Sequence, residues 1–357
     1  MLTAEGLALV ALAIVLAWPA PEALARARWP ARSPRAALVL WQAIGLGGGL
    51  AILSAGVTLA VSGLHRSWVG GLAALPRAAL GGGRPGPGSL GWTGVALTGI
   101  AAAWLLSVLA VSTARLLRVR REHRQRIDLL TEEVPAADLV TARPARPGLE
   151  PQSVPGAEPG TSASGMFGPA ASGSDREPRV RLVDHPLVAA YCLPGVRPRI
   201  VLSQGTIDAL RPDQLTAVVT HEHAHARGQH DLVIQPFRAW QQTFPFLPAA
   251  RRATAAVELL VEMTADDAAR RRCGAAPLAA ALAALADPAP GDSPPASPDG
   301  RPSPAGRERA APGDGQVAAR MARLTSAPRP LPRLAAGLVC AAAVILVALP
   351  PAILLAS

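Results

Sequence analysis

Four long runs of apolar residues divide the chain. They lie at about 2–18, 36–64, 90–114 and 334–355. The last three carry no charged residue, and the first carries only Glu5 near its start. A helix needs about 20 mostly apolar residues to cross a bilayer, so each run predicts a transmembrane helix. The alternatives are a buried core helix for any run and a signal peptide for the first, although basic residues follow that run instead of preceding it.

The second run contains a cluster of glycines. Gly45 and Gly49 stand four residues apart and would share one helix face. Small residues at this spacing let helices approach closely in lipid. We therefore expect this face to contact another span.

Arginine positions predict the orientation in the membrane. The loop after the first span holds four arginines, and the third span is followed at once by "RLLRVRREHRQR" at 115–126. Loops rich in Arg face the cytoplasm. The pattern places the amino terminus outside and residues 115–333 in the cytoplasm of a multi-pass cell-membrane protein. The basic juxtamembrane segment 115–141 also suits anionic lipid headgroups.

Two stretches rich in Pro, Gly, Ser and Ala interrupt the cytoplasmic region. They are 142–178 and 287–333, and such compositions predict disordered linkers. Residues 179–286 remain as a compact soluble domain, between three spans in 1–114 and a fourth in 334–357. Its pattern is strand, strand, helix, helix, with the helices at 211–228 and 249–273. The fold class is thus a mainly α membrane protein with four transmembrane helices and a small α+β cytoplasmic domain.

Charge and cysteine content exclude some functions. The net charge is +10, all positive side chains are Arg, and no nucleic-acid-binding motif accompanies them, so we expect no direct nucleic acid binding. The three cysteines include no C-x-x-C pair, which argues against a cysteine zinc site or a disulfide framework.

The stretch "HEHAH" lies at the end of a helix that begins near Pro212. His221 and His225 are four residues apart, on one helix face, where both can bind one Zn²⁺ per chain. Glu222 stands beside them and can accept a proton from a zinc-activated water, then deliver it to a leaving amine. The alternative for the motif is a charged helix that faces solvent.

A catalytic zinc needs a third protein ligand. Glu262 is favoured, because it lies on the next helix with Asp266 one turn later, where that carboxylate can orient a ligand histidine. Asp231, His230 and Glu258 are the less favoured candidates. The strand "RPRIVLSQGTI" is expected to present a sheet edge with which an extended substrate pairs.

The segments "LVDHPLVAAYCLPGVRPRIVLSQGTIDALRPDQLTAVVTHEHAHARGQHD" and "ELLVEMTADDAA" resemble the BlaR/MecR-type membrane metallopeptidases. They are similar, more distantly, to the HtpX/Ste-type peptidases. The resemblance implies a zincin-like cytoplasmic domain in which three residues bind zinc, Glu222 is the base and Asp266 orients a ligand. The zinc ligands it implies are His221, His225 and Glu262.

The resemblance implies a peptidase that acts on a protein or peptide, with a cytosolic transcriptional repressor as the expected target. Antibiotic-sensing relatives carry a penicillin-binding domain after the last span, and this sequence shows none, so we expect a different inducer. Quality control of membrane proteins is the second hypothesis. A non-catalytic membrane signalling protein with structural zinc is the third, and Glu222 argues against it because structural zinc needs no base.

Overall fold

The computed structural model of the chain describes residues 2–61, 70, 89–135, 179–193, 199–286, 314–326 and 328–356. The predicted linker 142–178 and the first part of the predicted linker 287–333 lie outside them. The described residues form two compact units. Unit 1 comprises Met1–Arg118, Asp231–Met263 and Pro328–Ser357, and unit 2 comprises Val119–His230 and Thr264–Ala327.

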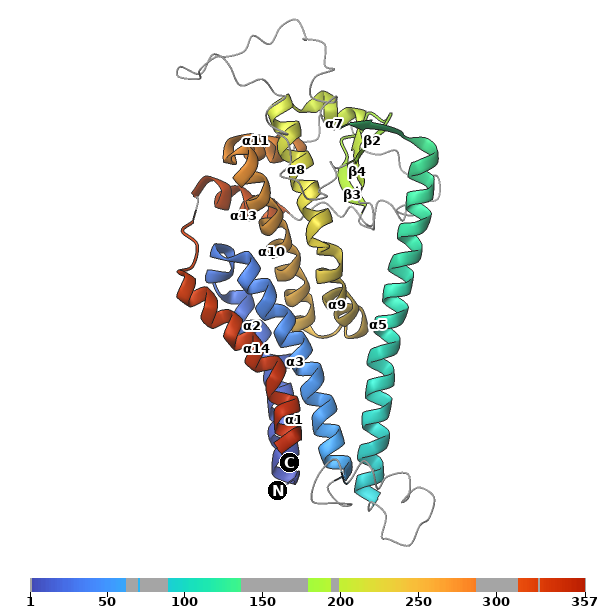
Figure 1. Ribbon diagram of the computed structural model, residues 1–357, viewed down its shortest axis with the longest axis vertical. Coiled ribbons are helices and arrows are strands. Elements are labelled where there is room, and N and C mark those ends of the chain that lie inside the picture. Colours follow the sequence, from blue (N-terminus) through green and yellow to red (C-terminus); the bar gives the residue numbers. More distant parts are fainter. Residues whose placement is uncertain are drawn as a thin grey trace, which may run out of the picture. The chain divides into compact units, whose positions relative to one another are not determined.

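Unit 1 is a helical bundle. Its apolar helices are α1 (Leu2–Ala17), α3 (Pro34–Val61), the first part of α5 (Ser89–Leu130) and α14 (Arg333–Ala356), with α2 (Pro19–Arg26) and the 3₁₀ turn η1 (Trp29–Arg32) joining α1 to α3. Helix α3 contacts both α1 and α14 (Figure 1). Four helical stretches are long and apolar enough to cross a membrane: Ala4–Arg26, Pro34–Thr58, Trp92–Gln125 and Arg333–Leu355. They indicate a multi-pass membrane protein.

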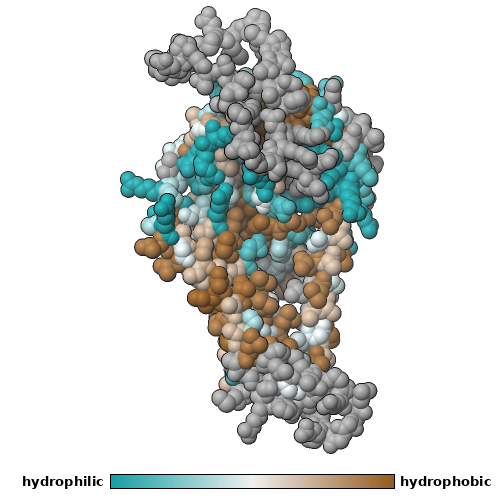
Figure 2. All heavy atoms as spheres, viewed as in Figure 1, coloured by the Kyte–Doolittle hydropathy of each residue, from teal (hydrophilic) through white to brown (hydrophobic). Residues whose placement is uncertain are grey.

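Hydrophobic side chains cover the outside of these helices. Figure 2 shows brown surface over the apolar part of the bundle. On α14 the exposed side chains include Leu334, Leu338, Val344 and Leu355. Such a continuous apolar surface suits contact with lipid tails, because in water it would drive association with other molecules.

One glycine of the second span lies at a close helix contact. A Cβ added at Gly47 would come within 2.6 Å of the main-chain oxygen of Leu346 in α14. Gly45, which the sequence pattern singled out, has open space instead. The close approach of α3 to α14 therefore depends on Gly47. The four-residue spacing identified the correct cluster but not the glycine that makes the contact.

Two further helices belong to unit 1. They are α9 (His230–Thr243) and the first part of α10 (Pro248–Cys273). The Trp41 ring of α3 packs edge-on against Phe237 of α9, with centroids 6.1 Å apart. Glu22 of α2 forms an ion pair with Arg252 of α10. Residues 231–263, which the sequence analysis assigned to the soluble domain, thus pack with the apolar helices.

Unit 2 contains a four-stranded sheet. Its strands are β1 (Glu132–Pro135), β2 (Arg179–Val183), β3 (Ala190–Leu193) and β4 (Arg199–Ser203), in the order β1-β2-β4-β3. β2 and β4 run parallel, and the other pairs are antiparallel. The expectation that "RPRIVLSQGTI" forms a sheet edge is wrong, because β4 pairs on both sides. The described edge strand next to helix α8 (Pro212–Gly228) is β3.

Several elements differ from their predicted extent. The first strand predicted for the soluble domain, which begins at Arg179, is two separate strands in the structure, β2 and β3. The second ends at Ser203, whose hydroxyl accepts a hydrogen bond from the Thr206 N–H and caps the short helix α7 (Gln204–Ala209). The predicted linker 287–333 contains helix α13 (Asp314–Ser326) and the start of α14. Helix α11 (Ala275–Ala286) completes unit 2.

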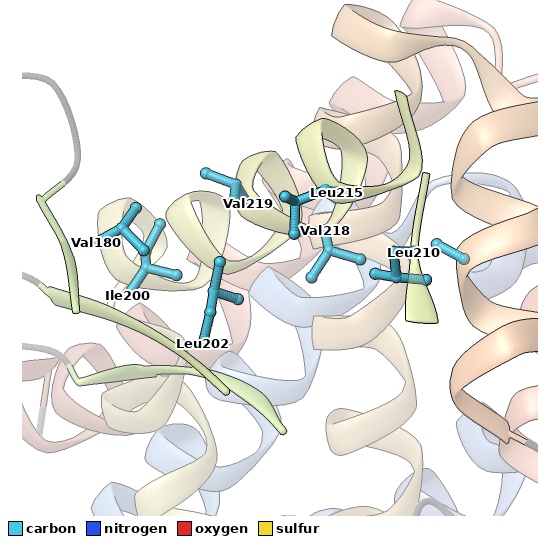
Figure 3. Close-up of a cluster of buried hydrophobic side chains, with 8 residues drawn as sticks. Val180, Ile200, Leu202, Leu210, Leu215, Val218 and Val219 are labelled. Carbon is cyan, nitrogen blue, oxygen red and sulfur yellow. The ribbon is translucent and has the colours of Figure 1, made fainter. Parts of the chain in front are cut away.

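The core of unit 2 lies between the sheet and α8. Figure 3 shows side chains of the two elements pointing toward one another. The cluster comprises Val180, Ile200, Leu202, Leu210, Leu215, Val218, Val219 and Ala281. Six of these side chains, all but Leu210 and Ala281, come from the sheet and α8. Each of the six contributes about 1.5–3 kcal/mol when fully buried, so they supply the main stabilisation of this contact. The core therefore fixes how α8 is rotated about its axis.

Candidate metal centre

The packing of α8 decides where its histidines point. The helix begins at Pro212, as predicted, and the main-chain N–H of Arg211 donates a 2.9 Å hydrogen bond to the Gln214 side chain. His221 and His225 follow Val218 by three and seven residues. Both therefore lie on the same face of α8 as Val218, the face that packs against the core. Hydrophobic packing in the first turns thus directs the two imidazoles inward.

Three side chains gather at this point. Ring nitrogens of His221 and His225 and a carboxylate oxygen of Glu262 all lie within 4.8 Å of one another. Glu262 stands one helical turn before Asp266 in the unbroken helix α10, and Asp266 contacts His221 within unit 2. The helix itself therefore holds Glu262 close to the histidines. Two imidazoles and one carboxylate are a donor set that zinc accepts.

The orientation of the two rings fits a metal ion. The Nε2 atoms of His221 and His225 face each other at 3.1 Å, close enough for one metal ion to bind both. The Nδ1 atoms point away, toward Asp266 and His230 respectively. A metal-binding histidine usually has its second ring nitrogen held by a carboxylate or another polar group. Both histidines satisfy this requirement.

Asp266 is a buried carboxylate with two kinds of partner. Its Oδ1 lies 3.1 Å from the Nδ1 of His221. The direction of this contact departs from that of a well-formed hydrogen bond. Burial raises the pKa of Asp266, but hydrogen bonds from Arg320 and the contact with His221 outweigh it, and the net pKa lies below its ordinary value. The carboxylate is ionised at neutral pH.

The less favoured ligand candidates take other positions. His230 is buried, and its Nδ1 lies 3.1 Å from the Nδ1 of His225, on the side away from His221. Glu258 accepts a 2.9 Å hydrogen bond from Arg238. Asp231 lies in the first turn of α9 and does not belong to the group of three donors found among the described residues. Glu222 follows His221 in α8 and is half-buried.

Two contacts at this site were not foreseen from the sequence. One is the role of His230 as a partner of His225, which follows from the left-handed conformation of Gln229 at φ 45°. The other is Arg320, which reaches Asp266 from α13. The sequence signals for the second contact are the adjacent carboxylates Asp266 and Asp267 and the two arginines, three residues apart, in "ARMARL".

Comparison with known proteins agrees with this chemistry. Residues 165–260 match the family model of Peptidase family M48. The matched part contains β2 to β4, α8 and Glu222, and it ends two residues before Glu262. No curated protein and no solved structure matches the chain. The family match supports a metallopeptidase.

Proposed function

We propose that this protein is a membrane-anchored zinc metalloendopeptidase whose metal ligands are His221, His225 and Glu262. The observation that carries the proposal is that ligand atoms of His221 and His225 on α8 and of Glu262 on α10 all lie within 4.8 Å of one another. Glu222 lies on α8 beside the two histidines. The match to a metallopeptidase family over this region supports it. The catalytic domain is proposed to face the cytoplasm, on the strength of the arginine-rich flanks of the spans.

The residues divide the chemistry between them. His221, His225 and Glu262 would hold a zinc ion, which would supply Lewis acidity for the hydrolysis of a peptide bond. Glu222 accepts the proton of the attacking water and delivers it to the nitrogen of the leaving amine. Asp266 and His230 hold the ring orientation of His221 and His225 through their Nδ1 atoms.

An extended substrate can bind beside this site. β3 is the described edge strand next to α8, and it is held on its other side by β4. An edge strand offers unpaired main-chain groups to a peptide in extended form. We propose that the substrate backbone pairs with β3, in place of the β4 edge that the sequence pattern favoured.

The physiological target is proposed to be a cytosolic transcriptional repressor, cleaved in response to a signal received by the membrane part. The sequence resemblance to membrane antirepressor peptidases supports this choice. Removal of damaged membrane proteins and a non-catalytic signalling role are the competing outcomes.

The experiment compares new protein amino termini in cells that carry the wild-type chain or the Glu222→Gln variant. The substitution keeps the side-chain shape and removes the base. Glu258→Gln, which lies outside the donor group, is the matched control. Defined fragments of a repressor that vanish only in Glu222→Gln cells support the proposal. Many vanishing membrane-protein fragments indicate quality control instead, and identical profiles favour the non-catalytic signalling role.

A further inference from the structure

Helix α13 joins the metal-bearing helix through two arginines. The Nε and Nη2 atoms of Arg320 donate hydrogen bonds of 2.8 and 2.7 Å to the two carboxylate oxygens of Asp266. Arg323, one turn later, donates bonds of 2.8 and 2.9 Å to Asp267. Both pairs are bidentate, which is the strongest geometry of an arginine–carboxylate contact. The two pairs thus dock α13 onto α10 in the same manner.

The two pairs differ in what lies behind the carboxylate. Asp266 contacts both Arg320 and His221, so Arg320 is connected to a proposed metal ligand through one carboxylate. Asp267 has Arg270 as its other partner, at 3.7 Å. Among the described residues, no hydrogen bond or ion pair links Asp267 to the three metal donors. Arg320 is 4% exposed and Asp266 is 1% exposed, so water cannot replace either partner.

Because Asp266 is buried, its charge and its orientation depend on the contact with Arg320. An ionised carboxylate inside a protein requires compensating hydrogen bonds and charge. Two parallel bonds from a planar guanidinium also fix the rotation of the carboxylate group. With both oxygens held, Oδ1 stays close to the Nδ1 of His221, at 3.1 Å. This arrangement favours the proton on Nδ1 and leaves the Nε2 lone pair available to a metal.

We propose that Arg320 is a positioning residue of the metal centre, which acts on the ligand His221 by fixing Asp266. Residues 314–326 lie beyond the part matched by the peptidase family and beyond the predicted domain 179–286. The metal centre is therefore completed by a helix that leads directly into the last apolar helix, α14. The inference rests on the proposed zinc site, but it does not require the protein to cleave peptides.

The test measures zinc affinity of the full chain, purified in detergent, by competition with a chromogenic chelator. The variants are Arg320→Gln and its matched control Arg323→Gln, which loses a bidentate contact of similar length but less complete burial and does not touch Asp266. We expect Arg320→Gln to weaken zinc binding by about ten- to hundredfold, as removal of such outer partners does. Arg323→Gln should stay within about twofold of the wild type, because Asp267 holds no ligand.

Cobalt substitution gives a second readout. The visible spectrum of Co²⁺ reports the ligand geometry, and a contact that only docks α13 leaves it unchanged. We expect the spectrum to change in Arg320→Gln and to match the wild type in Arg323→Gln. Arg320→Lys keeps the charge but not the bidentate geometry, so it should recover part of the lost affinity. If Arg320→Gln does not fold, Arg320→Lys is compared with Arg323→Gln and the wild type in its place.

Two results would overturn the inference. Equal losses of zinc affinity in Arg320→Gln and Arg323→Gln would show that α13 acts only by docking. An unchanged affinity and cobalt spectrum in Arg320→Gln would show that Asp266 needs no help to orient His221. Failure of the proposed function is recognised separately, as a chain that binds zinc with the expected dependence on Arg320 but cleaves nothing.

Discussion

The Nδ1 atom of His230 lies 3.1 Å from the Nδ1 atom of His225, although the two residues sit on different helices. Gln229 between the helices adopts a left-handed conformation and turns the chain back, so the first residue of α9 faces the last turn of α8. One imidazole donates and the other accepts in this contact. His225 can then present Nε2 to a metal.

This contact predicts a metal-binding defect in His230→Leu. The substitution removes the contact of His230 with the Nδ1 of His225, so zinc affinity should fall by about ten- to hundredfold. Asp231→Asn changes the neighbouring residue and is the control. Chelator competition measures both. A loss of zinc in Asp231→Asn but not in His230→Leu would identify Asp231 as the ligand and contradict the assignment.

Gly228 provides the space that His230 occupies. A Cβ at this position would collide with the His230 ring. We expect Gly228→Ala to destabilise the protein by about 1–3 kcal/mol, the usual cost of overpacking, and to weaken zinc binding as His230→Leu does. Thermal unfolding and chelator competition measure the two effects.

Gly274→Ala is the control for that substitution. Gly274 has φ +84°, and its added Cβ would have room, so the cost of about 1–2 kcal/mol comes from the backbone alone. Zinc affinity should not change. If Gly228→Ala also alters only the stability, His230 has no influence on the metal centre.

Glu262 and Glu258 provide a matched pair on one helix face. Glu262 belongs to the three-donor group, whereas Glu258 pairs with Arg238. Glu262→Gln should lose its zinc on dialysis, while Glu258→Gln retains it, because a carboxamide is a much poorer zinc ligand than a carboxylate. Metal analysis of the two dialysed proteins decides the third ligand. If Glu258→Gln lost its zinc and Glu262→Gln retained it, Glu258 would be the third ligand.

Gly47 and Gly45 test the packing of the apolar helices. Leucine at Gly47 would force α3 away from the main chain of Leu346, at a cost of about 1–3 kcal/mol. An added Cβ at Gly45 meets open space, so we expect leucine there to be tolerated. Unfolding of both variants in detergent measures the difference. Equal stability of the two would show that α3 and α14 do not make this close approach.

Local features of the site could be predicted from the sequence. The limits of α8 follow from Pro212 and Gly228, and the placement of His221 and His225 on one face follows from helix periodicity. The four apolar helices follow from length and composition. These properties depend on residues close together in the chain, which is why a pattern suffices.

Properties that depend on distant residues could not be predicted. Whether β4 lies at an edge or in the centre depends on its pairing with β2 and β3, which no local pattern reveals. Arg320 stands 54 residues after its partner Asp266, within a stretch that looked like linker. The grouping of α9 with the apolar helices depends on contacts such as Trp41 with Phe237.

The most direct test of the central claim is X-ray absorption spectroscopy at the zinc edge of the purified full chain. We expect one zinc per chain with nitrogen and oxygen ligands at about 2.0–2.2 Å and no sulfur ligand. That signal should be absent in His221→Ala. A zinc-free wild-type chain, a sulfur ligand, or an unchanged signal in His221→Ala would contradict the proposed metal centre and the peptidase chemistry built on it.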